Sequence, residues 1–524
     1  MPIVIILLLC LLSALAGYLL KIRGVRTAYI WMVLVFISVM IWLAFIVIPY
    51  NRFSPIIIND WFRFGETRIS LQFALNPQNR ILALSLFAVN LSFFLTGISR
   101  LDIRNDLTSW IYQLMLIAFS FLALITADLW SVVLLWTALD LLELTFHRLI
   151  IKDTNEKIYF RKFIIKSLGS ILLIWNIASL SRSGFNPLIN GIVSSSPNTS
   201  IILAALMHSG IFPFDTELKS SAEVKSSDLL KDLFVLLNFI VSFSLITNLQ
   251  APELPFVLSL AISIFSYIFI IYTSVHWAFD KDNDYSLRFL LLFETGIFIF
   301  LYFSGAAQFI TFLLALIAIS IPWLLFFTHR SKNLLILPVI SSFFITGLPL
   351  SMIAFGPRGF IGNGISVGLI VFLISQILFI VGYIKRAFDQ NEKFYELERW
   401  YQVAYLIGLF TPFLSAAAII FFSRTSISVE FQYWWIGLVV LMIGVLGYLY
   451  SGKTIIKNNS AKLISQERSI VFLRLLTFDW LFNIFSFLES KVRGFVNGFS
   501  GLMEGEGGIM WALVLLILIF TMLT

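Results

Sequence analysis

Long apolar runs fill most of the chain, and short polar connections separate them. Many runs reach the ~20 residues that an α-helix needs to cross the hydrocarbon core of a bilayer. The runs are continuous rather than alternating, which favours helices over the strands of a membrane barrel. About sixteen runs predict membrane helices by this criterion. They cover residues 3–20, 27–48, 80–98, 108–126, 129–150, 162–181, 198–212, 229–248, 254–275, 287–303, 307–328, 334–354, 364–384, 402–422, 433–450 and 508–523.

Two segments interrupt this rhythm. Residues 55–75 read PIIINDWFRFGETRISLQFAL, where polar and apolar positions alternate around a central glycine. This pattern predicts a short β-hairpin outside the membrane. Residues 462–503 are longer than a connection requires and are amphipathic in places. They predict a helical segment lying along the membrane surface before the last span.

The composition and the charges support a polytopic membrane protein. Hydrophobic residues make up 59% of the 524 positions and charged residues only 12%, whereas soluble domains carry about 25% charged residues. The mean hydropathy is +0.94. Lys and Arg gather in alternate connections, which places both termini on the outer side and supports an even number of spans. The net charge of +7 is therefore an orientation signal, and no nucleic-acid partner is expected.

Several kinds of site are not indicated. Cys10 is the single cysteine, which excludes a disulfide framework and a cysteine-ligated iron–sulfur cluster in this chain. The four histidines show no metal-ligand spacing, and no glycine-rich phosphate loop follows a strand-like segment. No cofactor and no metal are expected. The first apolar run has no positive residue before it, unlike a cleaved signal peptide, and predicts a retained helix.

Ionisable residues at membrane depth are the candidate functional groups, because they are costly there. In the fifth predicted helix Thr137, Asp140, Glu143 and His147 follow at spacings of 3, 3 and 4, which predicts one polar face. The alternative places Glu143 and His147 at the inner headgroups and leaves Asp140 alone in the interior.

The next predicted helix carries Lys162 and Lys166 four residues apart. Either lysine can face the acidic stripe, and an acid–lysine pair would act as a proton-loading switch because each charge biases the other group. The alternative for both lysines is anchoring at the cytoplasmic surface, which fits Lys162 better than Lys166.

The seventh predicted helix ends in HSGIFPF, where His208 precedes the helix breakers Gly210 and Pro213. An unperturbed histidine titrates near pH ~6.5 and can carry a proton; the alternative is a histidine that only bonds a neighbouring helix. Lys231, at the start of the eighth helix, and Glu294, the most isolated deep acid, complete the candidates of this part.

A second stretch of this kind, TGLPLSMIAFGPRGF at 346–360, contains the predicted break at Gly347 and Pro349 followed by Arg358. It lies about five helices after the first break, and corresponding broken helices in two halves of a transporter point to an ion path. Because five is an odd number, the two halves would have opposite orientations.

These stretches together resemble the antiporter-like subunits of respiratory complex I and of multisubunit sodium/proton antiporters. LMHSGIFPFDTELKSSAEV is similar to the family's seventh-helix motif, Lys-Ser-Ala-x-x-Pro-Phe-x-x-Trp-Leu. HWAFDKDNDYSLRFLLLFETGIF is similar to Asp-x-Lys-Arg-x-Leu-Ala-Tyr-Ser-Thr-x-x-x-x-Gly, and TGLPLSMIAFGPRGFI to Gly-x-Pro-Pro-x-x-Gly-Phe-x-x-Lys. The resemblance covers nearly the whole chain and is greatest for the large distal subunit with sixteen spans.

The resemblance implies an all-α membrane fold with two inverted five-helix repeats, helices 4–8 and 9–13, in which helices 7 and 12 are broken. It also implies a central hydrophilic axis for protons. The residues proposed for this relay are Asp140, Glu143, Lys166, His208, Lys231, Glu294 and Arg358. The chain departs from the family at several of them. Thr137 follows Trp136 where the family has a glutamate, His208 stands at the family's lysine, and the eleventh helix has no charge.

The same reasoning divides the chain into six parts. They are an N-terminal part at 1–105, the two repeats at 106–250 and 251–386, helices 14 and 15 at 387–451, the surface segment at 452–507 and the last span at 508–524.

The expected function is that of a membrane subunit of a larger proton-translocating assembly, working through both halves or through the first half alone. It would be non-catalytic by itself and part of an NADH:quinone oxidoreductase-like enzyme. Two alternatives stay open: a structural subunit that conducts nothing, and the membrane half of an inorganic-carbon uptake complex. The expected partners are other membrane subunits, a peripheral redox or carbon-uptake module, and lipids. The expected location is the bacterial inner membrane.

Overall fold

The computed structural model describes residues 2–48, 53–64, 67–100, 106–151, 156–182, 189, 195–211, 226–247, 249, 256–279, 283–304, 310–326, 367–388, 398–423 and 434–454. The chain divides into two units, Met1–Ile211 with Glu217–Ser460, and Phe212–Thr216 with Ala461–Thr524. The described residues all belong to the first unit.

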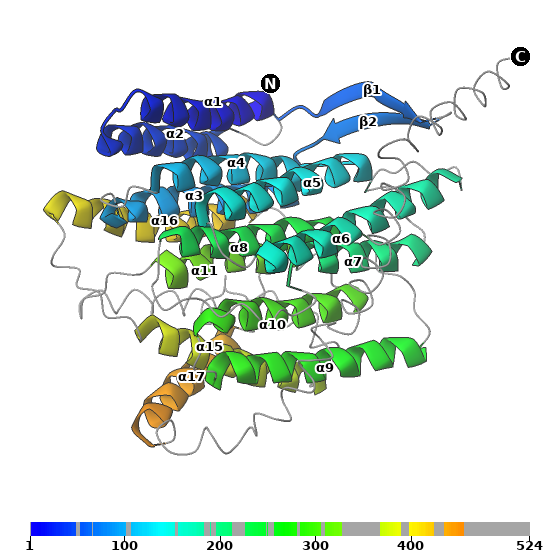
Figure 1. Cartoon of the computed structure of the whole chain (residues 1–524). Helices are drawn as coiled ribbons and strands as arrows, with labels where there is room; N and C mark the ends of the chain where they lie inside the picture. The colour runs from blue at the N-terminus through cyan, green and yellow to red at the C-terminus, as the bar shows by residue number, and fades with distance from the viewer. Residues whose placement is uncertain are drawn as a thin grey trace, which may run out of the picture. The chain divides into compact units, whose positions relative to one another are not determined.

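The described part is built of α-helices and one small sheet (Figure 1). Fourteen α-helices are present within these ranges: α1 Pro2–Ile22, α2 Thr27–Val47, α3 Pro77–Thr96, α4 Asp106–Leu124, α5 Leu129–Phe146, α6 Glu156–Arg182, α7 Ser195–His208, α8 Ser226–Thr247, α9 Phe256–Phe279, α10 Asn283–Phe303, α11 Ile310–Phe326, α15 Val367–Phe388, α16 Arg399–Ser423 and α17 Trp434–Thr454. Ten helices of this part are long and apolar enough to cross a membrane. The chain is therefore an integral membrane protein.

The helices follow the predicted apolar runs to within a few residues wherever the structure describes them. The runs at 334–354 and 508–523, the surface segment at 462–503 and the second break lie outside the described residues. The count of sixteen spans and the side of the membrane on which each terminus lies therefore stay predictions.

The β-hairpin predicted at 55–75 is present. Strands β1 (Ile56–Phe64) and β2 (Thr67–Phe73) pair in antiparallel register, with an irregularity between Ile58 and Phe62. Backbone hydrogen bonds then tie the end of β2 to the turn between α4 and α5. Ala74 N–H donates to the carbonyl of Ile125, and Ala127 N–H donates to that of Gln72.

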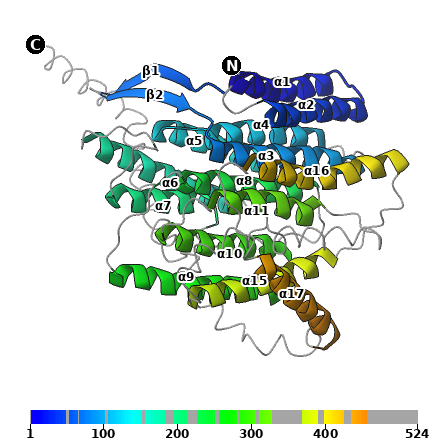
Figure 2. The same cartoon turned by 180° about the vertical axis from the view of Figure 1, so that it is seen from behind.

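Helices α4 to α8 form a closed ring in which each helix packs on the next and α8 returns to α4 (Figures 1 and 2). In the following part, α9 packs on α10 and α15, and α11 packs on both α10 and α15. The first and last helices of each predicted repeat thus touch. The two five-helix repeats and their inverted relation stay predictions.

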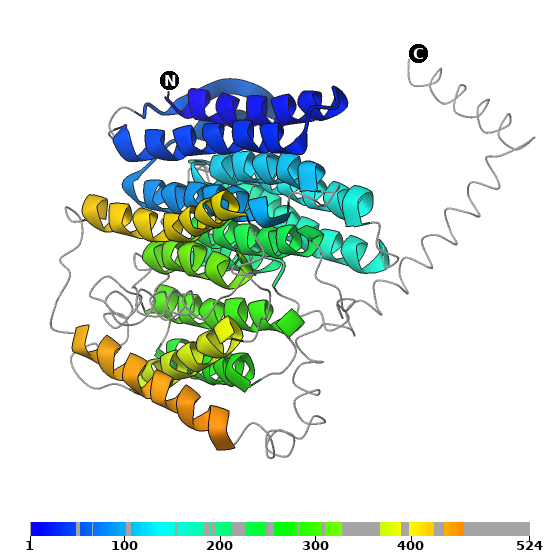
Figure 3. The same cartoon turned by 90° about the vertical axis from the view of Figure 1, so that its left-hand side faces the viewer.

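Helix α3 is the central element of the N-terminal part, and almost all of its side chains are buried. It packs against α2, α11 and α16 (Figure 3), and the ring of its Phe87 contacts Phe45 and Phe121 in tilted orientations. Its start is set by the Asn76 side chain, which accepts a hydrogen bond from Asn79 N–H, and by Pro77 at the first turn. The polar site lies in the ring beside this apolar support.

Candidate functional site

The acidic stripe of α5 faces the interior of the ring. Asp140, Glu143 and His147 are all buried, each with less than a tenth of its surface exposed. Thr137, which the spacing placed on the same face, is exposed instead, and its hydroxyl bonds the carbonyl of Leu134 on its own helix. Helical steps of three residues rotate by about 300°, so Thr137 lies about 60–120° away from the other three.

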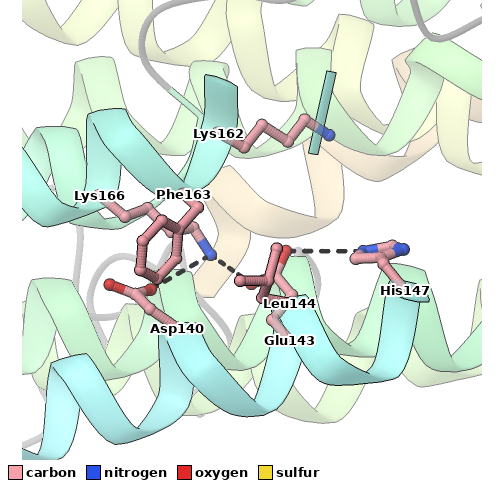
Figure 4. A pocket seen from close by; sticks show the side chains of 7 residues that line it. All are labelled: Asp140, Glu143, Leu144, His147, Lys162, Phe163 and Lys166. Atoms are coloured by element: carbon pink, nitrogen blue, oxygen red, sulfur yellow. Dashed lines mark hydrogen bonds and ion pairs between the residues drawn. The ribbon is translucent and has the colours of Figure 1, made fainter. Parts of the chain in front are cut away.

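Lys166 of α6 reaches into this stripe (Figure 4). Its ammonium group donates a hydrogen bond to Oε2 of Glu143 and lies 3.8 Å from Oδ1 of Asp140. Lys166 is only 4% exposed, which places its charge inside the protein rather than at the membrane surface. The anchoring alternative is therefore wrong for Lys166, and the acid–lysine pair predicted between adjacent helices is present.

Helix α7 ends at this cluster. Its 14 residues span only about 21 Å, short of the ~30 Å of a bilayer core. After His208 the chain turns through Gly210, whose φ is +69°. Helices α6 and α7 approach closely at Gly169, where a Cβ atom would lie 2.8 Å from the carbonyl oxygen of Ala204. The helix end at Gly210 is thus observed, and Pro213 lies outside the described residues.

His208 has three different neighbours. Its Nε2 lies 3.4 Å from Oδ1 of Asp140, and its Nδ1 lies 2.8 Å from the hydroxyl of Ser242 on α8. Its ring stacks on Trp136 of α5, with centroids 4.0 Å apart and planes 6° from parallel. The side chain has no exposed surface. His208 therefore bonds a neighbouring helix and also faces an acid, so both interpretations of this histidine describe part of its environment.

Helix α8 contributes two neutral groups that sequence reasoning missed. Asn238 donates a 2.7 Å hydrogen bond to Oε2 of Glu143, and Ser242 bonds His208. Lys231, Asn238 and Ser242 follow at spacings of 7 and 4, which puts them on one helix face. This regular spacing of polar residues in an apolar helix is the sequence signal that could have identified Asn238 and Ser242.

The other end of the cluster is at His147, where α5 passes into the π-helical turn His147–Ile151. His147 Nε2 lies 3.9 Å from Oε1 of Glu143, and Lys162 and Lys231 are within electrostatic range of the ring. A small cavity of about 10 Å³ opens here, lined by Asp140, Glu143, Leu144, His147, Lys162, Phe163 and Lys166 (Figure 4). This volume is about that of one water-sized sphere.

The remaining candidates are not brought into the cluster. Glu294 is 1% exposed on α10, and within the described residues neither of its oxygens has a hydrogen-bond partner. Glu294 is the twelfth residue of α10, and Asp140 is the twelfth residue of α5. The two acids therefore hold equivalent places in the second helix of each predicted repeat. Arg358, Gly347 and Pro349 lie outside the described residues.

The buried groups form a continuous line across three helices, α5, α6 and α7. From His208 it runs through Asp140, Lys166 and Glu143 to His147, and each step joins groups that can hold or release a proton. The longest gap between neighbouring polar atoms along this line is 3.9 Å. One bridging water or a small side-chain movement closes a gap of this size. The arrangement is suited to passing protons within the ring.

No protein-family model matches the sequence, and comparison with curated proteins finds no significant match. Solved structures do resemble the chain. A chain of the Mrp complex from Dietzia sp. DQ12-45-1b has a TM-score of 0.67 at 13% identity, with 100% of this chain and 63% of that chain covered. This chain thus spans about 63% of the length of the Mrp chain.

Two further structures come from respiratory complexes. A chain of the membrane-bound sulfane sulfur reductase, an archaeal respiratory membrane complex, has a TM-score of 0.58 at 14% identity, covering 98% of this chain and 99% of that one. A chain of respiratory complex I from Thermus thermophilus has a TM-score of 0.50 at 13% identity, covering 85% and 96%. The chain therefore has the fold of subunits from these membrane complexes, which is consistent with the antiporter-like subunit family that its sequence resembles.

Proposed function

We propose that the chain is a membrane subunit of a multisubunit ion-translocating assembly and that protons move through the ring α4–α8. The observation that carries this proposal is the buried line of titratable groups beside the end of α7. Ionisable groups are expensive inside a membrane and are retained there mainly for ion pathways. The fold shared with chains of the Mrp complex and of two respiratory complexes supports the role of a subunit.

The proposed path has a defined order. His208 receives or delivers protons at the end of α7, Asp140 and Glu143 hold them in turn, and Lys166 sets the balance between the two acids. Lys231 stands near the His147 end of the path, where Lys162 lies toward the start of α6. Glu294, with no described partner, and Arg358 are assigned to the second half, which either continues the path or does not conduct.

The chain carries no cofactor in this proposal and depends on partner subunits for its energy supply. Those partners are other membrane subunits and a peripheral module, in the inner membrane of a bacterium. Mass spectrometry of the purified assembly would identify them. Redox subunits would indicate an oxidoreductase, and a carbon-uptake partner would indicate the alternative function.

The test is proton translocation by the assembled complex in proteoliposomes, followed with a pH-sensitive dye. We expect Asp140→Asn and His208→Ala each to reduce translocation strongly while assembly is retained. Thr137→Val is the matched control, since Thr137 lies one turn from Asp140 but is exposed. Unchanged proton translocation in both site variants would instead support the alternative, a structural subunit that conducts nothing. Sodium uptake measured on the same vesicles distinguishes the transported ion.

A further inference from the structure

Ser242 lies beside His208, and its hydroxyl group already donates a hydrogen bond to a different acceptor. The Ser242 hydroxyl donates a 2.6 Å hydrogen bond to the carbonyl oxygen of Asn238, one turn earlier in α8. A serine hydroxyl has one hydrogen and two lone pairs. Its contact with Nδ1 of His208 at 2.8 Å must therefore be one in which Ser242 accepts.

This contact determines the tautomer of His208. Because Ser242 accepts, Nδ1 carries a hydrogen, and in the neutral ring Nε2 is then the bare nitrogen. Trp136, stacked on the ring at 4.0 Å, and the buried surroundings hold the imidazole plane in place. The bare Nε2 is thus directed at Oδ1 of Asp140, 3.4 Å away.

Two lone pairs that face each other in a buried site repel unless a proton lies between them. Neither Asp140 oxygen nor Nε2 of His208 has another hydrogen-bond partner in the described structure.

We propose that Asp140 and His208 share one proton and that Ser242 is the positioning residue that directs Nε2 of His208 toward Asp140. The transfer is balanced: a neutral Asp140 carboxyl and a neutral His208 become a carboxylate and an imidazolium when the proton moves from Oδ1 to Nε2. Lys166, 3.8 Å from the same oxygen, favours the carboxylate as it approaches and the carboxyl as it withdraws toward Glu143. The inference rests on the proposed proton path and gives its central step.

The test reads the tautomer directly. The chain has four histidines, so nitrogen-15 histidine labelling and solid-state NMR of the assembled complex in lipid are practicable, with subtraction of a His208→Gln spectrum. We expect Nδ1 of His208 to be protonated, with Nε2 either bare or protonated. Ser242→Ala should convert the ring to the form with a bare Nδ1, while Ser242→Thr should restore the original signals. Ser244→Ala, on a different face of α8, is the control.

Two results would overturn the proposal: a bare Nδ1 in the unaltered protein, or a His208 spectrum unaffected by Ser242→Ala. Translocation is measured on the same samples. Ser242→Ala should lower it by roughly 10- to 100-fold, the equilibrium effect of one hydrogen bond to a charged group, and Ser242→Thr should recover it. If the tautomer changes as expected but translocation does not, the positioning role of Ser242 stands and the proposed proton path is wrong.

Discussion

Asn238 on α8 and Lys166 on α6 donate to the same oxygen atom, Oε2 of Glu143. One carboxylate thus joins three helices of the ring, and the amide supplies a neutral donor while the lysine supplies the charge. A carboxylate with two donors on one oxygen is held in a fixed orientation. Glu143 is consequently the structural centre of the cluster, whereas Asp140, with no full hydrogen bond, is free to change partners.

The first prediction concerns this amide. Asn238→Leu removes a hydrogen bond to a buried charge and should lower the stability of the protein by about 1.5–3 kcal/mol. Thermal unfolding in detergent measures the change. Thr247→Val on the same helix is the control, because among the described residues the Thr247 hydroxyl bonds the carbonyl of Ser244 on its own helix. Equal effects of the two substitutions would contradict the assignment of Asn238 to the site.

The second prediction concerns the ion pair between Lys166 and Glu143. Breaking a buried pair leaves one charge without its partner, so Lys166→Met should cost about 3–5 kcal/mol. The double substitution with Glu143→Gln removes both charges and should cost less than Lys166→Met alone. A double-mutant cycle on the unfolding free energy measures this coupling. Additive costs would show that the two side chains do not interact.

The third prediction compares two glycines with the same backbone conformation. Gly210 and Gly24 both have φ of +69°, but a Cβ at Gly210 would lie 2.9 Å from Cε of Lys166, whereas a Cβ at Gly24 would meet no atom of the described residues within 4 Å. Alanine should cost about 1–2 kcal/mol of backbone strain at either position. Only Gly210→Ala should also displace Lys166 and reduce proton translocation. If Gly210→Ala and Gly24→Ala translocate protons equally well, the close packing of Lys166 against Gly210 is not needed for proton transfer.

The fourth prediction concerns the start of α5. Asp128 caps this helix by accepting from Ser131 N–H at 2.8 Å, and its other oxygen accepts from Gln72 N–H at 2.7 Å. Asp128→Ala should lose the cap, worth about 1 kcal/mol, and also the link to β2. Asn76→Ala at the start of α3 is the comparison, because the Asn76 side chain caps its helix by accepting a hydrogen bond from Asn79 N–H. We expect the larger loss of thermal stability for Asp128→Ala.

The sequence predicted the helices and the hairpin well, because apolar length and alternation depend on local chemistry. It also placed Asp140, Glu143 and Lys166 toward one another from their helical spacing. Thr137 was assigned wrongly because steps of three residues drift around the helix. Asn238 and Ser242 were missed because their regular spacing with Lys231 does not by itself show which face of α8 lies inside the ring.

The early end of α7 has a consequence that involves no side chain. The carboxyl end of a helix carries about half a negative charge, spread over its last carbonyl groups. Because α7 ends at His208, this partial charge lies in the protein interior, beside the Lys166 ammonium group and the His208 ring. The fixed dipole of the main chain therefore attracts a positive charge at this point, such as the Lys166 ammonium group. No substitution of an acid removes this dipole, so it is a permanent part of the electrostatic field of the cluster.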